Sequence, residues 1–152
     1  MMTVKELEKS EARKLLISNF IKKYEYLLPD PYSKHVDIDE YSSKLNEFGV
    51  VFLAQNDGDV IGLVSGYIND YKTCSAYLQI IIVRQMSQKS GCGSALIRAF
   101  IDKAKSEYKS GNVYLNVDKS NTHAYEVYKH IGFIESERLH PNPLKQIMQY
   151  TF

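Results

Sequence analysis

The stretch Gln88-Lys89-Ser90-Gly91-Cys92-Gly93 decides the fold, because a strand pattern precedes it and a helix pattern follows it. Residues 77–83 are rich in β-branched and aromatic side chains, which favour a strand. Residues 96–108 repeat apolar side chains at helical spacing. Two close glycines that open a helix let the backbone approach an anion and point free N–H groups at it. With the positive charge of Lys89, these features predict a phosphate site.

Two common phosphate-binding motifs do not match this loop. The dinucleotide fingerprint requires a third glycine, and Leu96 stands in its place. The P-loop requires a Gly-Lys-Ser or Gly-Lys-Thr ending, which the stretch lacks. The plain structural alternative is a glycine-containing turn between strand and helix, with Lys89 in solvent.

A second block of sequence narrows the interpretation. It consists of Leu115-Asn116-Val117, Asn121, Ala124, Tyr128 and Gly132-Phe133, in that order. Together the two blocks resemble the signature of the GNAT superfamily of acyl-CoA N-acyltransferases. That signature joins a Q/R-x-x-G-x-G/A pyrophosphate loop to a strand and then to N-x-x-A-x-x-x-Y-x-x-x-G-F. The resemblance is clear from about residue 50 to 133.

The resemblance implies an α/β (α+β) fold with a mixed and mostly antiparallel sheet flanked by helices. From the length of 152 residues we expect a single domain over residues 1–152. Most family members open with a strand, but only Thr3-Val4-Lys5 is available, so we expect that strand to be missing or vestigial. Apolar periodicity predicts one or two helices before Pro29 and further helices near residues 39–48, 93–109 and 121–131. Strands are expected near residues 50–54, 60–68, 73–83, 112–117, 133–138 and 146–152, the first two as a hairpin.

Composition excludes several classes of protein. Of the 152 residues, 44% are hydrophobic and 24% charged, which is ordinary for a globular domain. The net charge of +1 argues against nucleic-acid binding, which needs a concentrated basic face. Residues 1–11 show no signal peptide, the apolar run 80–83 is too short to span a membrane, and two cysteines imply no disulfide framework. We therefore expect a cytoplasmic protein without membrane contact; a monomer and a homodimer both remain open.

The resemblance implies acetyl-CoA as co-substrate and no metal. The glycine loop would hold the pyrophosphate, and the strand before it would pair with the pantetheine arm. Asn121 would cap a helix, with cofactor contact an open alternative. The residues expected at the cofactor are Ile81, Ile82, Val83, Gln88, Lys89, Ser90, Gly91, Cys92, Gly93, Ser94, Asn116, Asn121, Ala124, Tyr125 and Tyr128.

Tyr128 is the expected catalytic residue, since it matches the family's tyrosine that protonates the departing CoA thiolate. A phenol stays protonated at neutral pH and can donate to such a group. The alternative is that Tyr128 only packs on its helix face. Tyr125, one turn earlier, is expected to pack on the cofactor rather than to act as an acid.

The general base stays open at the sequence level. Positions where relatives carry a glutamate hold Tyr77 and Asn116, so a water held by Gln79, Asn116 or backbone carbonyls is one possibility. The remaining candidates are His35, Asp37, Asp39 and Glu40. His123 and His130 are expected to be exposed helix residues.

The segment 24–48 is expected to wall the acceptor site, and its tyrosines and carboxylates suit a cationic amine or a sugar. Packing of these tyrosines on the sheet, with the acids in water, is an equal alternative. The function that follows is acetyl transfer from acetyl-CoA to a primary amine of a small molecule, such as an amine or amino sugar, by direct attack. A catalytically weak acyl-CoA-binding or sensing module, a protein N-acetyltransferase and a longer acyl donor are the alternatives.

Overall fold

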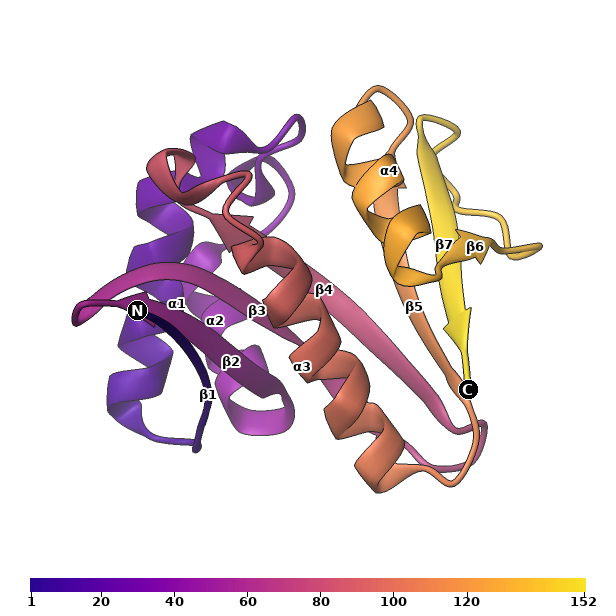
Figure 1. The fold of residues 1–152 in the computed structure, drawn as a ribbon, viewed down its shortest axis with the longest axis horizontal. Coiled ribbons are helices and arrows are strands. Elements are labelled where there is room, and N and C mark those ends of the chain that lie inside the picture. The colour runs from indigo at the N-terminus through magenta and orange to yellow at the C-terminus, as the bar shows by residue number, and fades with distance from the viewer.

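A computed structural model describes residues 1–152 as one seven-stranded sheet with helices on both faces (Figure 1). The strands follow the order β1-β2-β3-β4-β5-β7-β6. All neighbours pair antiparallel except β4 and β5, which run parallel. The expected mixed, mostly antiparallel sheet flanked by helices is therefore confirmed.

The elements lie close to the expected ranges, and local sequence explains most of their ends. The strands are β1 Met2–Leu7, β2 Val50–Asn56, β3 Asp59–Asp70, β4 Ser75–Val83, β5 Asn112–Asp118, β6 Ile134–Glu135 and β7 Lys145–Thr151. The helices are α1 Glu11–Tyr24, α2 Ile38–Phe48, α3 Cys92–Glu107 and α4 Thr122–Ile131, with short 3-10 turns at Glu25–Leu27, Tyr32–Lys34 and Gln85–Ser87. Asp57 and Gly58 both have positive φ, 51° and 86°, which gives the β2–β3 hairpin its tight turn.

Two expectations about strands were wrong. The first strand is not vestigial, because β1 pairs with β2 over all six of its residues. As a half-exposed edge strand it needs only Met2 and Val4 against the core, so its sequence pattern is weak. The strand expected over residues 133–138 is shortened to β6, because the chain turns away from β7 after the Ser136 N–H donates to the Ile147 carbonyl.

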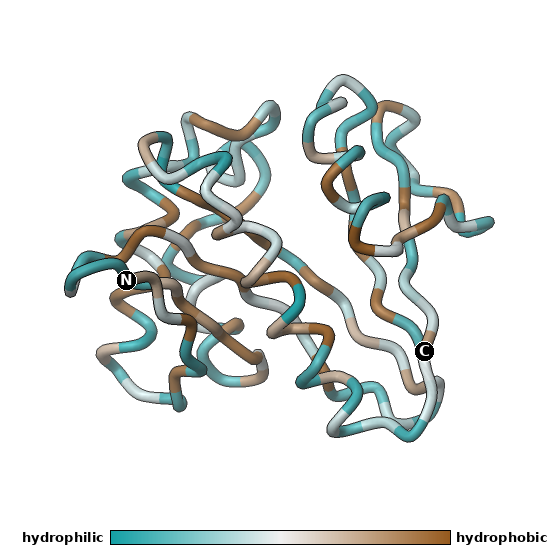
Figure 2. Tube along the Cα trace, in the orientation of Figure 1, coloured by the Kyte–Doolittle hydropathy of each residue, from teal (hydrophilic) through white to brown (hydrophobic).

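Each face of the sheet has its own apolar core. Phe100, Leu96 and Ile97 of α3 pack with Tyr128 and Ile131 of α4 on one face. On the other face, Ile17 and Ile21 of α1 and Leu45 of α2 pack on Ile80 and Ile82. Hydrophobic stretches accordingly concentrate in the central strands and α3, whereas the connecting loops are mostly hydrophilic (Figure 2). None of the helices is long and apolar enough to cross a bilayer.

Candidate active site

The sheet splits between β4 and β5, and this split creates the site. The two strands pair only where Ser75–Tyr77 lies beside Asn112–Tyr114, and then they diverge (Figure 1). Just after β4, the Arg84 N–H donates to the Ile61 carbonyl of β3 at 2.9 Å. Backbone groups along a strand point to alternate sides, so Ile82 and Ile80 also direct their N–H and C=O groups toward β3. Ile81 and Val83 therefore turn their N–H and C=O groups toward the gap, where no strand meets them.

The glycine loop lies at the open end of this gap. Lys89 and Gly91 have left-handed φ values of 66° and 84°, and this alternation curls the backbone into a concave turn before α3. The first α3 amide with an acceptor in its own helix is that of Ala95, which donates to the Gly91 carbonyl at 3.0 Å. The amides just before it are free, and a Cβ on Gly91 would meet nothing within 4 Å. The loop is therefore an open cradle of N–H groups at the positive end of a helix dipole, which suits an anion.

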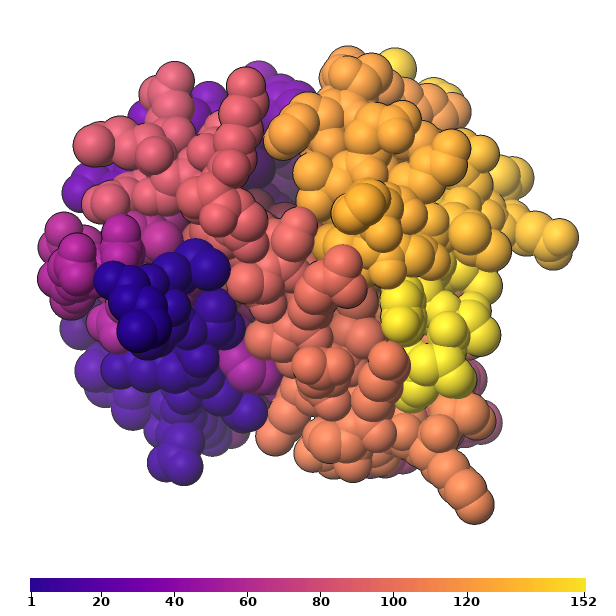
Figure 3. Space-filling model, viewed as in Figure 1, coloured from indigo at the N-terminus to yellow at the C-terminus, as the bar shows by residue number.

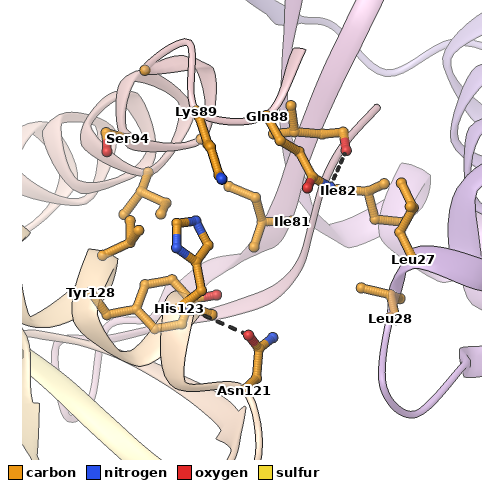
Figure 4. A pocket seen from close by; sticks show the side chains of 16 residues that line it. Leu27, Leu28, Ile81, Ile82, Gln88, Lys89, Ser94, Asn121, His123 and Tyr128 are labelled. Carbon is orange, nitrogen blue, oxygen red and sulfur yellow. Dashed lines mark hydrogen bonds between the residues drawn. The ribbon is translucent and has the colours of Figure 1, made fainter. Parts of the chain in front are cut away.

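A cavity of about 340 Å³ connects this cradle to the gap between the strands; we call it the loop cavity. In the space-filling view it is a hollow between the chain before α3 and helix α4, with the N-terminal part of the chain at its base (Figure 3). Figure 4 shows Lys89 and His123 reaching toward one another from opposite walls, above Tyr128. The predicted cofactor residues that line this cavity are Ile81, Ile82, Val83, Gln88, Lys89, Gly91, Gly93, Ser94, Asn121, Ala124 and Tyr128.

Four predicted cofactor residues do not line the loop cavity. The Cys92 side chain is 1% exposed and packs in the core, while the Ser90 hydroxyl turns back to donate to the Ser87 carbonyl. Tyr125 packs against the core outside the cavity, because Ala124 and Tyr128 occupy the inner face of α4. Asn116 lines the neighbouring cavity instead. These four side chains therefore lie outside the loop cavity, although the backbone amides of Ser90 and Cys92 still belong to the loop.

Other lining residues were missed from the sequence, namely Leu27, Leu28, Ile97, His123 and Val127. His123 is exposed, as expected, yet it faces the loop cavity (Figure 4). Its spacing of four residues from Val127 was an available signal, because both then share a helix face. Leu27 and Leu28 gave no such signal, since they reach the cavity through the tertiary fold.

A second cavity of about 460 Å³ lies beside the first, and we call it the tyrosine cavity because Tyr32, Tyr41 and Tyr128 line it. The two cavities share Leu28, Ile81, Asn121 and Tyr128. Asn121 caps α4 by accepting from the Ala124 N–H at 3.2 Å. The Tyr128 side chain is 7% exposed, and burial raises its pKa to about 12. A protonated phenol therefore stands where the two cavities meet.

An ionic cluster lines the tyrosine cavity. The Lys145 ammonium lies 3.0 Å from the Asp30 carboxylate and 3.4 Å from that of Asp118. These two ion pairs connect the loop after α1 with the end of β5 and the start of β7. His35 Nε2 lies 2.8 Å from the same Asp30 carboxylate. The hydrogen bond with His35, followed by that from Lys145, lowers the Asp30 pKa. The site thus holds two carboxylates, one lysine and a histidine positioned by a carboxylate.

The structure separates the candidate bases. Of the four, only His35 lines the tyrosine cavity. The Asp37 side chain caps α2 by accepting from the Glu40 N–H, and Asp39 accepts from Ser18 and binds Lys22 on the outer side of α1. Gln79 and Asn116 do line the cavity, where their carboxamides can hold water but cannot take up a proton.

Of the tyrosines of the segment 24–48, Tyr32 and Tyr41 line the tyrosine cavity, whereas Tyr24 packs on the core and Tyr26 is exposed. The Tyr32 hydroxyl donates to the Gln79 carbonyl, and burial raises the pKa of Tyr32. Gln79 is the extra residue of a β-bulge, because Ser65 and Gly66 pair with Ile80 and Leu78 on either side of it. The Tyr41 ring packs against that of Tyr32 at a tilt of 31° with 5.4 Å between centroids, and the buried Tyr41 hydroxyl has no partner in the protein. Tyr32 and Tyr41 thus form a wall of the tyrosine cavity, and the Tyr32 hydroxyl anchors this wall to the bulge of β4.

Comparison with known proteins agrees with this geometry. Residues 12–133 match the acetyltransferase (GNAT) family. An N-alpha-acetyltransferase of Sulfurisphaera tokodaii is 28% identical over 141 residues, 86% of this chain and 82% of that protein. The crystal structure of the ribosomal-protein-S18-alanine N-acetyltransferase from Escherichia coli superposes with a TM-score of 0.76 at 20% identity, covering 99% of this chain and 94% of that one.

A structure of an aminoglycoside 6′-N-acetyltransferase complexed with coenzyme A superposes with a TM-score of 0.75 at 16% identity, covering 98% and 96% of the two chains. At such identities the two structures show the fold alone, whereas the family match covers most of the chain. The split between β4 and β5, the cradle of amides before α3 and the buried tyrosine on α4 are consistent with that match. The chain belongs to the GNAT family of N-acetyltransferases.

Proposed function

We propose that this enzyme transfers an acetyl group from acetyl-CoA to a primary amine of a small molecule, by direct attack of the amine on the thioester. The observation that carries the proposal is the meeting of two cavities at Ile81 and Tyr128. One cavity ends in an anion cradle and the other is lined by charged and aromatic groups. Such an arrangement suits two substrates that enter from different sides and react where the cavities join.

The residues of the loop cavity fit the parts of acetyl-CoA. The amides of the glycine loop and the Lys89 ammonium would hold the pyrophosphate. The free backbone groups of Ile81 and the Val83 N–H would pair with the amides of the pantetheine arm, whereas the Val83 carbonyl already accepts a hydrogen bond from Gln88 Nε2 at 3.2 Å. When bound, acetyl-CoA supplies an activated thioester. The Ile81 N–H, at the junction of the cavities, would donate to the carbonyl oxygen on which negative charge develops.

The tyrosine cavity supplies groups for the amine. His35, held by Asp30, would take the proton that the amine must lose, directly or through water. Tyr128 would donate a hydrogen bond from its hydroxyl to the sulfur on which charge accumulates as the carbon–sulfur bond breaks. A covalent cysteine intermediate is disfavoured, because Cys92 is buried in the core and burial raises the pKa of its thiol.

The acceptor can belong to one of two classes of molecule. The Sulfurisphaera tokodaii relative is named for α-amino groups, which makes a peptide N-terminus the second candidate. The tyrosine cavity, about 460 Å³, is of a size that suits a small molecule, and for this reason we favour one.

Thiol release from acetyl-CoA tests the proposal when it is measured over amino sugars, amino acids, polyamines and short peptides. Amine-dependent release, with the acetylated amine identified by mass, would support it, and the best substrate would name the acceptor class. If calorimetry shows tight acetyl-CoA binding and no amine gives release, the chain is a binding or sensing module and the proposal is wrong.

A further inference from the structure

A third cavity continues the acceptor side of the site. It measures about 90 Å³ and lies where β4 and β5 begin to diverge; we call it the arginine pocket, because Arg138 lines it. Tyr77 and Tyr114 form its wall, and it shares Leu78, Gln79 and Asn116 with the tyrosine cavity. The two spaces therefore form one groove that leads away from Tyr128 toward Arg138.

Arg138 is positioned for a ligand. Its guanidinium lies 3.9 Å from the centroid of the Tyr114 ring, and Tyr77 stacks on Tyr114 with 5.8 Å between centroids. A hydrogen bond with Tyr77 raises the pKa of Arg138. No carboxylate lies within salt-bridge distance of this guanidinium. The nearby Asp70 carboxylate instead accepts hydrogen bonds from the Thr73 hydroxyl at 2.7 Å and the Tyr77 hydroxyl at 3.4 Å. The planar, always charged group therefore keeps donors free at the end of the groove.

The middle of the groove is polar but uncharged. The carboxamides of Gln79 and Asn116 line both of its parts and make no hydrogen bond to another protein group. At the Tyr128 end, Asp30 and Asp118 share Lys145. A molecule with an amine at one end and an anion at the other matches this order of charges, whereas a polycation would meet Lys145 and Arg138.

We propose that the acceptor is an elongated primary amine that carries a carboxylate or phosphate several bonds from its nitrogen, and that Arg138 binds this anionic group. The inference rests on the proposed function and specifies its substrate class. Arg138 then determines specificity: it contacts the far end of the acceptor and takes no part in the transfer. The carboxamides of Gln79 and Asn116 bind the connecting chain.

Matched acceptors test this inference. Steady-state rates are measured with ω-amino carboxylates, the corresponding amides and the corresponding diamines of equal chain length, together with ω-aminoalkyl phosphates and tripeptides with free or amidated C-termini. The wild type should show a KM at least about tenfold lower for an anionic amine than for its amide, because a charge-assisted hydrogen bond distinguishes them. Arg138→Gln should abolish that preference and leave kcat and the KM for the amides unchanged.

Arg98→Gln, at an exposed position of α3, removes the same charge outside all three cavities and should keep the preference. Equal KM values for anionic and neutral amines, a preference for diamines, or an equal loss for all acceptors in Arg138→Gln would overturn the inference. The free and amidated tripeptides, compared with the small acids, distinguish a peptide source of the anion from a small molecule.

A readout that does not need turnover separates this inference from the proposed function. The side-chain amide signals of Gln79 and Asn116 are followed by NMR in the CoA-bound protein while 6-aminohexanoate or its amide is added. Shifts with the acid alone, lost in Arg138→Gln, would support the arginine site even if no acetyl transfer occurs. Absence of shifts with either compound would refute it.

Discussion

Replacement of Tyr128 by phenylalanine isolates the chemistry of one hydroxyl group. The Tyr128 ring packs on Phe133 with 5.9 Å between centroids, and phenylalanine keeps this contact. The hydroxyl donates to no protein acceptor, so its removal breaks no internal hydrogen bond. The free energy of unfolding should therefore change by less than about 0.5 kcal/mol. Any loss of activity can then be assigned to the reaction.

The expected loss follows from the raised pKa. Full transfer of a proton from a phenol with a pKa of about 12 to a thiolate of ordinary pKa, about 8.5, is uphill by about 5 kcal/mol. We therefore expect Tyr128 to stabilise the leaving sulfur mainly by a hydrogen bond. A hydrogen bond to a charged group contributes about 1.5–3 kcal/mol, which corresponds to about 10- to 150-fold in kcat.

Thiol release at saturating acetyl-CoA measures this loss, with calorimetry of CoA binding beside it. Tyr128→Phe should lower kcat within that range and leave the affinity for CoA nearly unchanged. Tyr71→Phe, at a 60% exposed residue outside all three cavities, serves as the control and should keep full activity. A kcat within threefold of the wild type would remove Tyr128 from the mechanism.

Four further predictions concern the loop, the cap, alkaline stability and the base. Gly91→Val should weaken CoA binding at least about 100-fold in calorimetry, because its side chain would fill the cradle. The free energy of unfolding should fall only by the left-handed strain, about 1–2 kcal/mol. Unchanged affinity would place the phosphates elsewhere. Asn121→Ala should lower the free energy of unfolding in urea by about 1 kcal/mol, because the Ala124 N–H loses its capping hydrogen bond. An unchanged free energy of unfolding would show that this cap does not stabilise α4. The folded pKa of Tyr128, about 12, lies above its unfolded value of about 10, so its stabilising contribution is complete below pH 10 and declines by up to roughly 3 kcal/mol as the pH rises to 12. Tyr128→Phe should therefore lose less stability than the wild type between pH 9 and about 11.5, and parallel losses would refute the burial of the phenol. His35→Gln should lower kcat/KM about 100-fold, with partial rescue by added imidazole, and full activity would return the base to water.

The sequence predicted the parts of the site that are local in the chain. The strand before residue 84, the glycine loop and the first turn of α3 follow one another directly, so their chemistry could be inferred without the fold. The spacing from Asn121 to Tyr128 places both on one helix, which allowed the cap and the catalytic candidate to be named together. The burial of the Cys92 side chain could not be predicted, because the sequence places a residue in a loop but does not show which way its side chain turns.

The parts assembled from distant segments could not be predicted. Lys145 meets Asp30 and Asp118 only because β7 pairs with β5 while the loop after α1 crosses the open end of the split sheet. The pairing of β1 depends on hydrogen bonds supplied by β2, which a weak edge-strand pattern does not reveal. Arg138 reaches Tyr114 because β6 is short, whereas the sequence pattern had predicted a strand through this residue.

The central claim is that acetyl-CoA binds in the split of the sheet with its pyrophosphate on the loop before α3. Backbone amide NMR during titration with CoA tests it most directly, because every amide of the chain reports separately. The account predicts large shifts for residues 89–94, Ile81 and Val83, with little change in β1 and α1. Shifts confined to other segments, or none at saturating CoA, would contradict it.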